Sequence, residues 1–460
     1  MQRVVAIAWL TWKAAFRFRL FLVMAVLLLA SVVGLPLLIK DDGTARGFTQ
    51  ILLTYTLSTI SALLGLSTLW LACGTLARDI EECQMQIVAV KPIARWQIWL
   101  GKWLGLVSLN AALLALSGAS VYGLLQWRAH RLPIDQQQVL RSEVLVARGS
   151  VRQKNIDSLI DEQTDAALKE RLQKSPVARV DLVEVRKQIR EQIKADHQIV
   201  PPGAQRTWEL ELGHIKDSLA GRPLQLRIKF NSADQTTSGT FMGLWAIGDP
   251  PKAPLTRLEP MSLAPETFHE FDIPANLDEN GVLTITFVNL NNIALLFPLD
   301  EGIEVLYHQG GFGFNFTRGL GIIFCWMGLL GALGLAAASF LSFPVAAFVA
   351  VSVMTLVLCS GTLANAVSEG TIANYNSEKG TKGSSPLDIV VIPTFKAILT
   401  VINLAQNFSP IDSLSSGRSI TWLELAKAFG QVVLLLGGIL GLFGITVFTR
   451  RELATAQGTQ

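Results

Sequence analysis

The chain has 460 residues, of which 50% are hydrophobic and only 16% are charged, whereas a soluble protein averages about 25% charged residues. The apolar residues lie in long runs, so the composition argues against a soluble globular protein and favours an integral membrane protein. The net charge of +3 is too small to indicate a nucleic-acid partner, and the four cysteines show no spacing typical of a metal, redox or disulfide framework.

Residues 1–127 predict an amphipathic helix followed by three membrane spans. The first nineteen residues mix apolar, basic and tryptophan side chains. This mixture is typical of a helix in the headgroup plane, and equally of an ordinary basic flank. Three apolar runs follow that are long enough to cross a hydrocarbon core of about 30 Å. They cover residues 20–39, 48–76 and 99–125.

Residues 128–315 predict an inserted α+β domain, because charge is dense and no run is long enough to span. Helical spacing over residues 153–198 predicts a helical pair or stalk. Over residues 205–310 the apolar period changes to two, which predicts a β-sandwich of about seven or eight strands. The strongest strand patterns cover residues 208–212, 224–230, 282–287 and 303–307.

Residues 316–460 predict three more spans, so the fold class expected is a polytopic α-helical membrane protein with six transmembrane helices. The segment 388–427 is apolar but interrupted by Pro393, Lys396 and Asn403, which predicts a re-entrant or interfacial segment. The three spans cover residues 320–341, 344–363 and 429–448.

The distribution of basic residues predicts the orientation of these spans. Lysine and arginine flank the first span, the loop between spans two and three, and the end of the last span. The positive-inside rule places all three in the cytoplasm. We therefore expect a multi-pass protein of the inner (plasma) membrane with cytoplasmic termini, while the 128–315 domain and the 388–427 segment are extracytoplasmic.

The loop between spans two and three is the strongest functional candidate. Its sequence predicts a helix over residues 79–90, with acidic residues near the start, where the helix dipole favours them, and Pro92 as its end. Anchored between two spans, this helix can transmit force from a cytoplasmic partner. A generic cytoplasmic loop that obeys the positive-inside rule explains the charges equally well.

The motif that follows this loop resembles a known family. Lys91-Pro-Ile-Ala-Arg-Trp-Gln-Ile-Trp-Leu-Gly-Lys-Trp-Leu-Gly105 is similar to the P-[IV]-[SA]-R…G-K-x-x-G pattern of type-2 ABC transporter (ABC-2) permeases. The ending Phe448-Thr-Arg-Arg-Glu452 resembles the family's F-x-R-R-E/D tail, and residues 410–424 resemble the segment before its last span. The resemblance covers residues 1–127 and 316–452. It departs from the family's E-x-G-T pattern at Cys83 and Gln84.

The resemblance implies that the chain is a permease subunit driven by a separate cytoplasmic ATPase, which binds the ATP and magnesium. The sequence has no phosphate-binding loop of its own, so we expect neither enzymatic activity nor a cofactor in this chain. Six spans imply a dimer with a second permease copy, in contact with membrane lipid. The residues expected at the ATPase-coupling interface are Asp79, Glu81, Glu82, Gln86, Lys91, Pro92 and Arg95.

Other candidate residues are weaker. Asn110 and Asn365 can line a translocation path, although hydrogen bonding between helices is at least as good an explanation. The aromatic residues of the inserted domain, Trp208, Phe241 and Trp245, can stack on a sugar or fill the core, and a core role is favoured. The five histidines have no metal-site spacing. Calcium can bind in the strand loops at Asp249, Asp272, Asp278 and Glu279, although a role as ordinary turn residues is favoured.

Two alternatives to a transporter subunit remain at this stage. The spans can serve as a membrane anchor that displays the 128–315 domain to a polysaccharide or an envelope protein. A membrane-embedded enzyme is a third hypothesis. The absence of paired intramembrane acids or histidines disfavours it.

Overall fold

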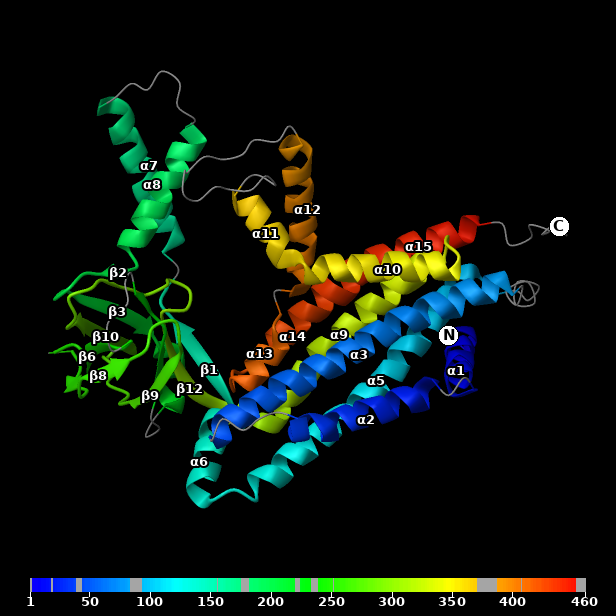
Figure 1. The fold of residues 1–460 in the computed structure, drawn as a ribbon, viewed down its shortest axis with the longest axis horizontal. Helices are drawn as coiled ribbons and strands as arrows, with labels where there is room; N and C mark the ends of the chain where they lie inside the picture. The colour runs from blue at the N-terminus through cyan, green and yellow to red at the C-terminus, as the bar shows by residue number, and fades with distance from the viewer. Residues whose placement is uncertain are drawn as a thin grey trace. The chain divides into compact units, whose positions relative to one another are not determined.

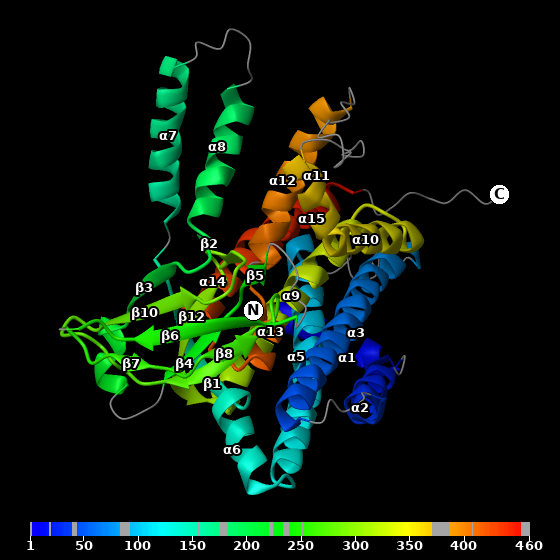
Figure 2. The same ribbon diagram turned by 60° about the vertical axis from the view of Figure 1, so that its left-hand side comes forward.

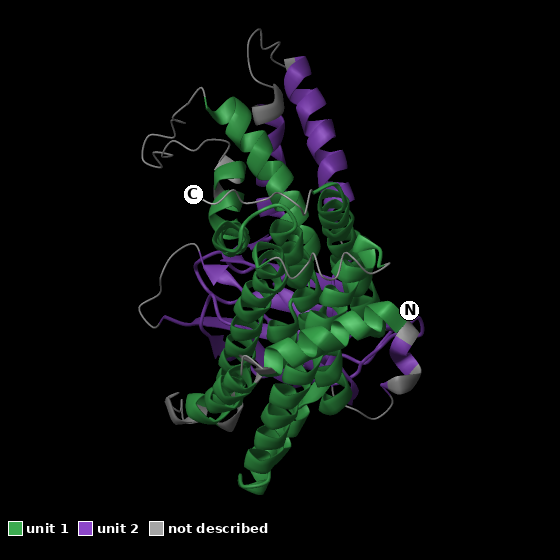
Figure 3. Ribbon diagram, turned by 90° about the vertical axis from the view of Figure 1, so that its right-hand side faces the viewer, with its two compact units in different colours: residues 1–147, 311–460 green, residues 148–310 purple. Residues whose placement is uncertain are grey.

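A computed structural model describes residues 2–17, 20–38, 44–82, 93–154, 156–174, 182–219, 224–232, 239–250, 252–369, 387–406 and 408–451. Its contacts divide the chain into two compact units (Figure 3). The membrane unit contains Met1–Ala147 and Gly311–Gln460, and the inserted unit contains Arg148–Gly310.

The membrane unit is helical, and its long helices run side by side (Figure 1). Its first five helices are α1 (Gln2–Arg17), α2 (Leu20–Leu38), α3 (Ala45–Glu81), α5 (Arg95–Ala129) and α6 (Ile134–Glu143). After the insertion come α9 (Phe312–Ala338), α10 (Phe343–Leu358), α11 (Ser360–Glu369), α12 (Asp388–Gln406) and α13 (Pro410–Ser415). The last helix is continuous through α14 (Trp422–Ala428), the π-helix η2 (Phe429–Gly437) and α15 (Gly438–Arg450).

Five helices in the described residues are long and apolar enough to cross a membrane. Four coincide with predicted spans, and the fifth, Asp388–Ser415, falls in the segment predicted to be re-entrant or interfacial. Two other predicted spans correspond to shorter apolar helices, Leu22–Leu35 and Phe343–Leu358. The membrane character of the chain is thus supported, whereas the count of six spans stays a prediction.

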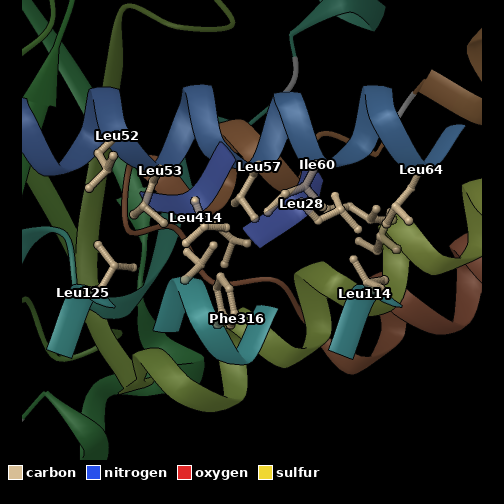
Figure 4. Close-up of a cluster of buried hydrophobic side chains, with 14 of the residues drawn as sticks. Leu28, Leu52, Leu53, Leu57, Ile60, Leu64, Leu114, Leu125, Phe316 and Leu414 are labelled. Carbon is tan, nitrogen blue, oxygen red and sulfur yellow. The ribbon is translucent and has the colours of Figure 1, made fainter. Parts of the chain in front are cut away.

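Leucine side chains from α2, α3 and α5 form the core of the membrane unit (Figure 4). Leu53, Leu57 and Leu64 of α3 are fully buried there. They repeat at intervals of four and seven, which places them on one face of the helix. Phe316 of α9 and Leu414 of α13 complete the same cluster. This core joins the helices that precede the insertion to those that follow it.

The inserted unit contains twelve strands within the described residues. One sheet has the order β1-β12-β4-β9, a second has β3-β10-β6-β7 with β8 also paired to β6, and a third has β2-β11-β5. The longer strands are β1 (Val146–Arg152), β3 (Gln205–Glu211), β4 (Leu224–Ile228), β6 (Phe241–Ile247), β9 (His269–Ile273), β10 (Val282–Asn289) and β12 (Ile303–Gly311). The shorter elements are β2 (Ile199–Val200), η1 (Gly213–Ser218), β5 (Asn231–Ser232), β7 (Thr256–Arg257), β8 (Met261–Leu263) and β11 (Leu295–Leu296).

The first two sheets share one hydrophobic core, as expected for a β-sandwich. Leu226 and Val305 enter it from one sheet, and Trp245 and Ile285 enter it from the other. The antiparallel register of β3 and β10 places Trp208 opposite Ile285 on this inner face. The four strands with the strongest sequence pattern are confirmed as β3, β4, β10 and β12. The two sheets of the sandwich contain nine of the described strands, against the predicted seven or eight, because the short strands β7 and β8 add to the count.

Two helices of the inserted unit, α7 (Asp157–Lys174) and α8 (Leu182–Asp196), stand side by side (Figure 2). They confirm the predicted helical pair. Ion pairs join the two helices. Arg186 lies 2.9 Å from Asp165, and Arg190 lies 2.9 Å from Asp161.

Candidate coupling site

The predicted coupling residues lie where α3 ends and α5 begins. Asp79 and Glu81 belong to the last turn of α3, and Glu82 caps it. Arg95 is the first residue of α5. The rest of the predicted coupling helix, with Cys83, Gln84, Gln86, Lys91 and Pro92, lies outside the described residues.

Asp79 forms an ion pair with Lys102, the lysine of the G-K-x-x-G motif. Lys102 Nζ lies 2.5 Å from the Asp79 carboxylate and donates a second hydrogen bond of 2.7 Å to the carbonyl oxygen of Thr75. The Lys102 side chain is only 9% exposed, and that of Asp79 is 34% exposed. A buried ammonium group needs such partners. The pair therefore fixes the start of α5 to the end of α3.

The two glycines of the same motif fix α5 to the N-terminal helix. A Cβ atom on Gly101 would lie 2.7 Å from Cβ of Ile7, and one on Gly105 would lie 2.7 Å from Cβ of Thr11. The backbones of α1 and α5 therefore approach closely, as small residues allow between membrane helices. Elsewhere on α1 the side chains of Val5, Trp9, Leu10 and Phe16 are exposed, and the amphipathic role of this helix stays a prediction.

Glu81 caps the start of α10. Its Oε1 accepts a 2.8 Å hydrogen bond from the backbone N–H of Phe343. A carboxylate is favoured at a helix N-terminus, where backbone N–H groups lack partners within the helix. The guanidinium of Arg78 lies 4.4 Å from the centre of the Phe343 ring, and Trp70 meets the same ring edge-on. The end of α3 is therefore fastened to the start of α10.

Arg95 caps the end of the last helix. It donates hydrogen bonds of 2.8, 2.9 and 2.6 Å to the carbonyl oxygens of Phe448, Thr449 and Arg451. A cation is favoured at a helix C-terminus because the last carbonyl groups lack partners within the helix. Arg451 in turn donates a 3.2 Å hydrogen bond to the carbonyl oxygen of Ser339, just beyond α9. These helix ends gather at one end of the membrane unit, at the right of Figure 1.

We call this set the tethered end: Arg78, Asp79, Glu81, Arg95, Lys102 and Arg451, with their partners. Asp79, Glu81 and Arg95, which were predicted to face an ATPase, thus have partners inside the chain. The internal roles of Lys102 and Arg451 were not predicted, although both residues belong to motifs that carried the family resemblance. The sequence does contain a signal for Lys102. This lysine lies between Gly101 and Gly105, and two glycines spaced four residues apart are typical of a close contact between membrane helices.

The two asparagines predicted for a path belong to different helices. Asn110 is buried in α5, at 3% exposure. Asn365 belongs to α11, and its side chain lies outside the described residues. Their role in a path stays a prediction.

The inserted unit offers no exposed aromatic surface at the residues considered for sugar binding. Trp208, Phe241 and Trp245 are each at most 3% exposed and belong to the sandwich core. At the turn before β10, Lys216 Nζ donates hydrogen bonds to the backbone carbonyl oxygens of Asp278 and Glu279. A lysine ammonium group, which is itself a cation, therefore binds the oxygens of this turn. Among the described residues, no group of three or more histidine, cysteine, aspartate or glutamate side chains can hold a metal ion.

Comparisons with known proteins leave the family open. The sequence matches no protein-family model, no curated protein and no solved structure.

Proposed function

We propose that this chain is the membrane-spanning subunit of an ABC transporter of the ABC-2 type. In this proposal a separate cytoplasmic ATPase binds the loop that joins α3 to α5, and ATP hydrolysis there drives export or conformational work on an extracytoplasmic partner. The chain pairs with a second permease copy in the inner membrane, with both termini in the cytoplasm. ATP and magnesium are bound by the partner.

The tethered end is the observation that carries this proposal. Asp79, Glu81 and Arg95 surround the loop, and each holds a different helix: α5, α10 and the last helix. A displacement of the loop therefore acts on all three helices together. A loop with no mechanical role needs only to join two spans. The motifs that resemble the family's loop and tail also meet here, through Arg95 and Arg451.

The internal partners of these residues decide how the proposal is tested. Charge reversal at Asp79, Glu81 or Arg95 would break the tethers and unfold this end, whether or not an ATPase binds. Gln86→Arg with Lys91→Glu changes the loop itself. We expect this double variant to lose a co-purifying ATPase while its melting temperature stays that of the wild type. Lys169→Glu, an exposed site on α7, is the matched control and should retain the ATPase.

Retention of the ATPase by the Gln86→Arg/Lys91→Glu variant would contradict the proposed docking site. The wild-type chain can also be co-expressed with ATPase subunits that are encoded by neighbouring genes. If no ATPase co-purifies with it, the alternative of a membrane anchor is favoured. The anchor hypothesis gains support from the inserted unit's own core. It predicts that binding to a polysaccharide or an envelope protein does not depend on ATP.

A further inference from the structure

The last helix contains a π-helix of nine residues, η2. π-helices are rare, occur mostly as single-turn bulges, and are frequent at functional sites. Hydrogen bonds from residue i to i+5 place more residues in each turn than the α-helix does. A π segment is therefore wider and shorter than an α-helix with the same number of residues.

Contacts with α9 lie on both sides of this segment. The last helix and α9 run in the same direction, because Leu425, Val433 and Gly444 meet Gly321, Gly328 and Ala336 in that order. Fifteen residues separate Gly321 from Ala336, whereas nineteen separate Leu425 from Gly444. At 1.5 Å per residue these intervals correspond to about 23 Å and about 29 Å of α-helix. The last helix has more residues than an α-helix needs between its two contacts.

Both ends of the last helix are held firmly. At the end nearest the tethers, a Cβ on Gly444 would lie 2.9 Å from Nε1 of Trp99 and 3.0 Å from Cα of Ala336. At the other end, the side chain of Asn315 is fully buried. It donates a hydrogen bond to the carbonyl oxygen of Arg418 and accepts one from the N–H of Ile420.

The π segment itself is only partly buried in the membrane unit. Of its nine residues, only Val432 and Gly437 are fully buried. Gly430 and Gly438 lie at the two ends of the segment, and a Cβ on either would meet nothing within 4 Å. No neighbouring atom requires glycine there. Glycine does weaken the α-helix at these positions, because it has a much lower helix propensity than alanine.

We propose that Phe429–Gly437 is a compressed joint that lengthens the last helix when it converts from π to α. The half that contains Gly444 and Phe448 stays on Trp99 and Arg95, and α14 advances along α9. A shift of one residue corresponds to about 1.5 Å and about 100° of rotation. The advance of α14 also moves the loop that precedes it. In this loop Gly417 lies against the carbonyl oxygen of Glu143. Glu143 is three residues before Val146, where β1 begins. Movement in the last helix thereby reaches the point where the chain leaves the membrane unit.

Crosslinking of the full-length chain in lipid nanodiscs tests the joint without an ATPase, so its failure leaves the proposed function untouched. The four native cysteines are first replaced by alanine. Arg318→Cys with Trp422→Cys reports the contact of α9 with α14, where the guanidinium lies 5.6 Å from the ring. Phe340→Cys with Phe443→Cys reports the contact at the other end, where the rings lie 5.8 Å apart.

Gly430→Ala with Gly438→Ala should favour the α form. We expect crosslinking between positions 318 and 422 to fall by roughly an order of magnitude, while crosslinking between positions 340 and 443 is unchanged. Gly34→Ala with Gly123→Ala is the matched control, because those helical glycines also have open space at Cβ. It should leave both crosslinks unchanged. If the double alanine variant leaves both crosslinks unchanged, or weakens both equally, the joint does not exist.

Deletion of one residue gives a second measurement. Removal of Leu434 from the π segment lets i to i+5 bonds become i to i+4 bonds while both contacts with α9 stay in place. We expect this protein to fold with the melting temperature of the wild type. Removal of Leu442, an equally exposed leucine of α15, shifts Gly441 out of register with Gly444 and should lower the melting temperature. Equal damage from both deletions would overturn the proposal.

Discussion

The ammonium group of Lys102 lies 2.5 Å from the carboxylate of Asp79, across the junction of α3 and α5. Removal of one partner from a fully buried ion pair costs about 3–5 kcal/mol, whereas an exposed pair contributes about 1 kcal/mol or less. Because the Asp79 side chain is about one-third exposed, we expect Asp79→Asn to destabilise the membrane unit by about 2 kcal/mol. Thermal unfolding in detergent measures this change.

A double-mutant cycle separates the ion pair from general damage. Lys102→Met removes the buried charge that Asp79→Asn leaves unpaired, so the two losses should not add. The double variant should unfold close to the temperature of the Lys102→Met variant. Strict additivity would show that the two side chains do not interact.

The close approach of α1 to α5 predicts a second effect. Gly105→Ala places a Cβ 2.7 Å from Cβ of Thr11 and 3.0 Å from the carbonyl oxygen of Ala8. Overpacking of this kind costs about 1–3 kcal/mol. We expect α1 to separate, so that trypsin cleaves after Lys13 and Arg17 several times faster. Gly123→Ala on the same helix meets nothing within 4 Å and should leave the cleavage rate unchanged.

The α7–α8 pair should respond to acid. The hydrogen bond from Arg190 holds the pKa of Asp161 below its ordinary value of 3.8. A carboxylate whose folded pKa is depressed contributes stability above the unfolded pKa and loses it as the pH falls through the folded pKa. We therefore expect hydrogen exchange in α7 and α8 to accelerate below about pH 4. Arg190→Gln should weaken this acid response, because the pair of Arg186 with Asp165 remains, and an identical response in that variant would contradict the assignment.

Buried charges on one sheet of the inserted unit predict a larger loss. Glu270 is 5% exposed and lies 2.9 Å from Arg148 and 3.6 Å from Arg227. Glu270→Ala leaves two buried cations short of a partner, which costs about 3–5 kcal/mol. Hydrogen exchange of β4 and β9 in the full-length chain measures the loss. Lys229→Ala, which breaks the exposed pair with Glu301, should change the exchange rates far less.

Local patterns were sufficient to predict the long apolar helices, the helical pair and four of the longer strands. Alternation at Trp208, Leu224, Val282 and Ile303 identified β3, β4, β10 and β12, because each strand has one face in the core. β1 was missed, because its residues Ala147, Gly149 and Ser150 are too small or polar to alternate in hydrophobicity. It is a strand because β12 pairs with it, and pairing partners more than 150 residues apart leave no local signal.

The tethered end shows a similar division. The charges around the loop were found from sequence, but their partners were not. Glu81 is 262 positions from Phe343, and Arg95 is 356 positions from Arg451. The partners of Glu81 and Arg95 are backbone N–H and carbonyl groups. Almost every residue has these groups, so the sequence cannot show which residue supplies the partner. The π segment was not predicted either. The apolar run that contains it is typical of any membrane span, and nothing in that run distinguishes i to i+5 from i to i+4 hydrogen bonding.

The adjacency of β1 and β12 has a consequence for how such a chain can diversify. The strand that enters the inserted unit is the direct neighbour of the strand that leaves it, and neighbouring strands lie about 4.8 Å apart. The two points at which the chain enters and leaves the inserted unit are therefore about as close together as the two strands of a hairpin. A different inserted domain can therefore join the same helices, provided that its two ends lie side by side.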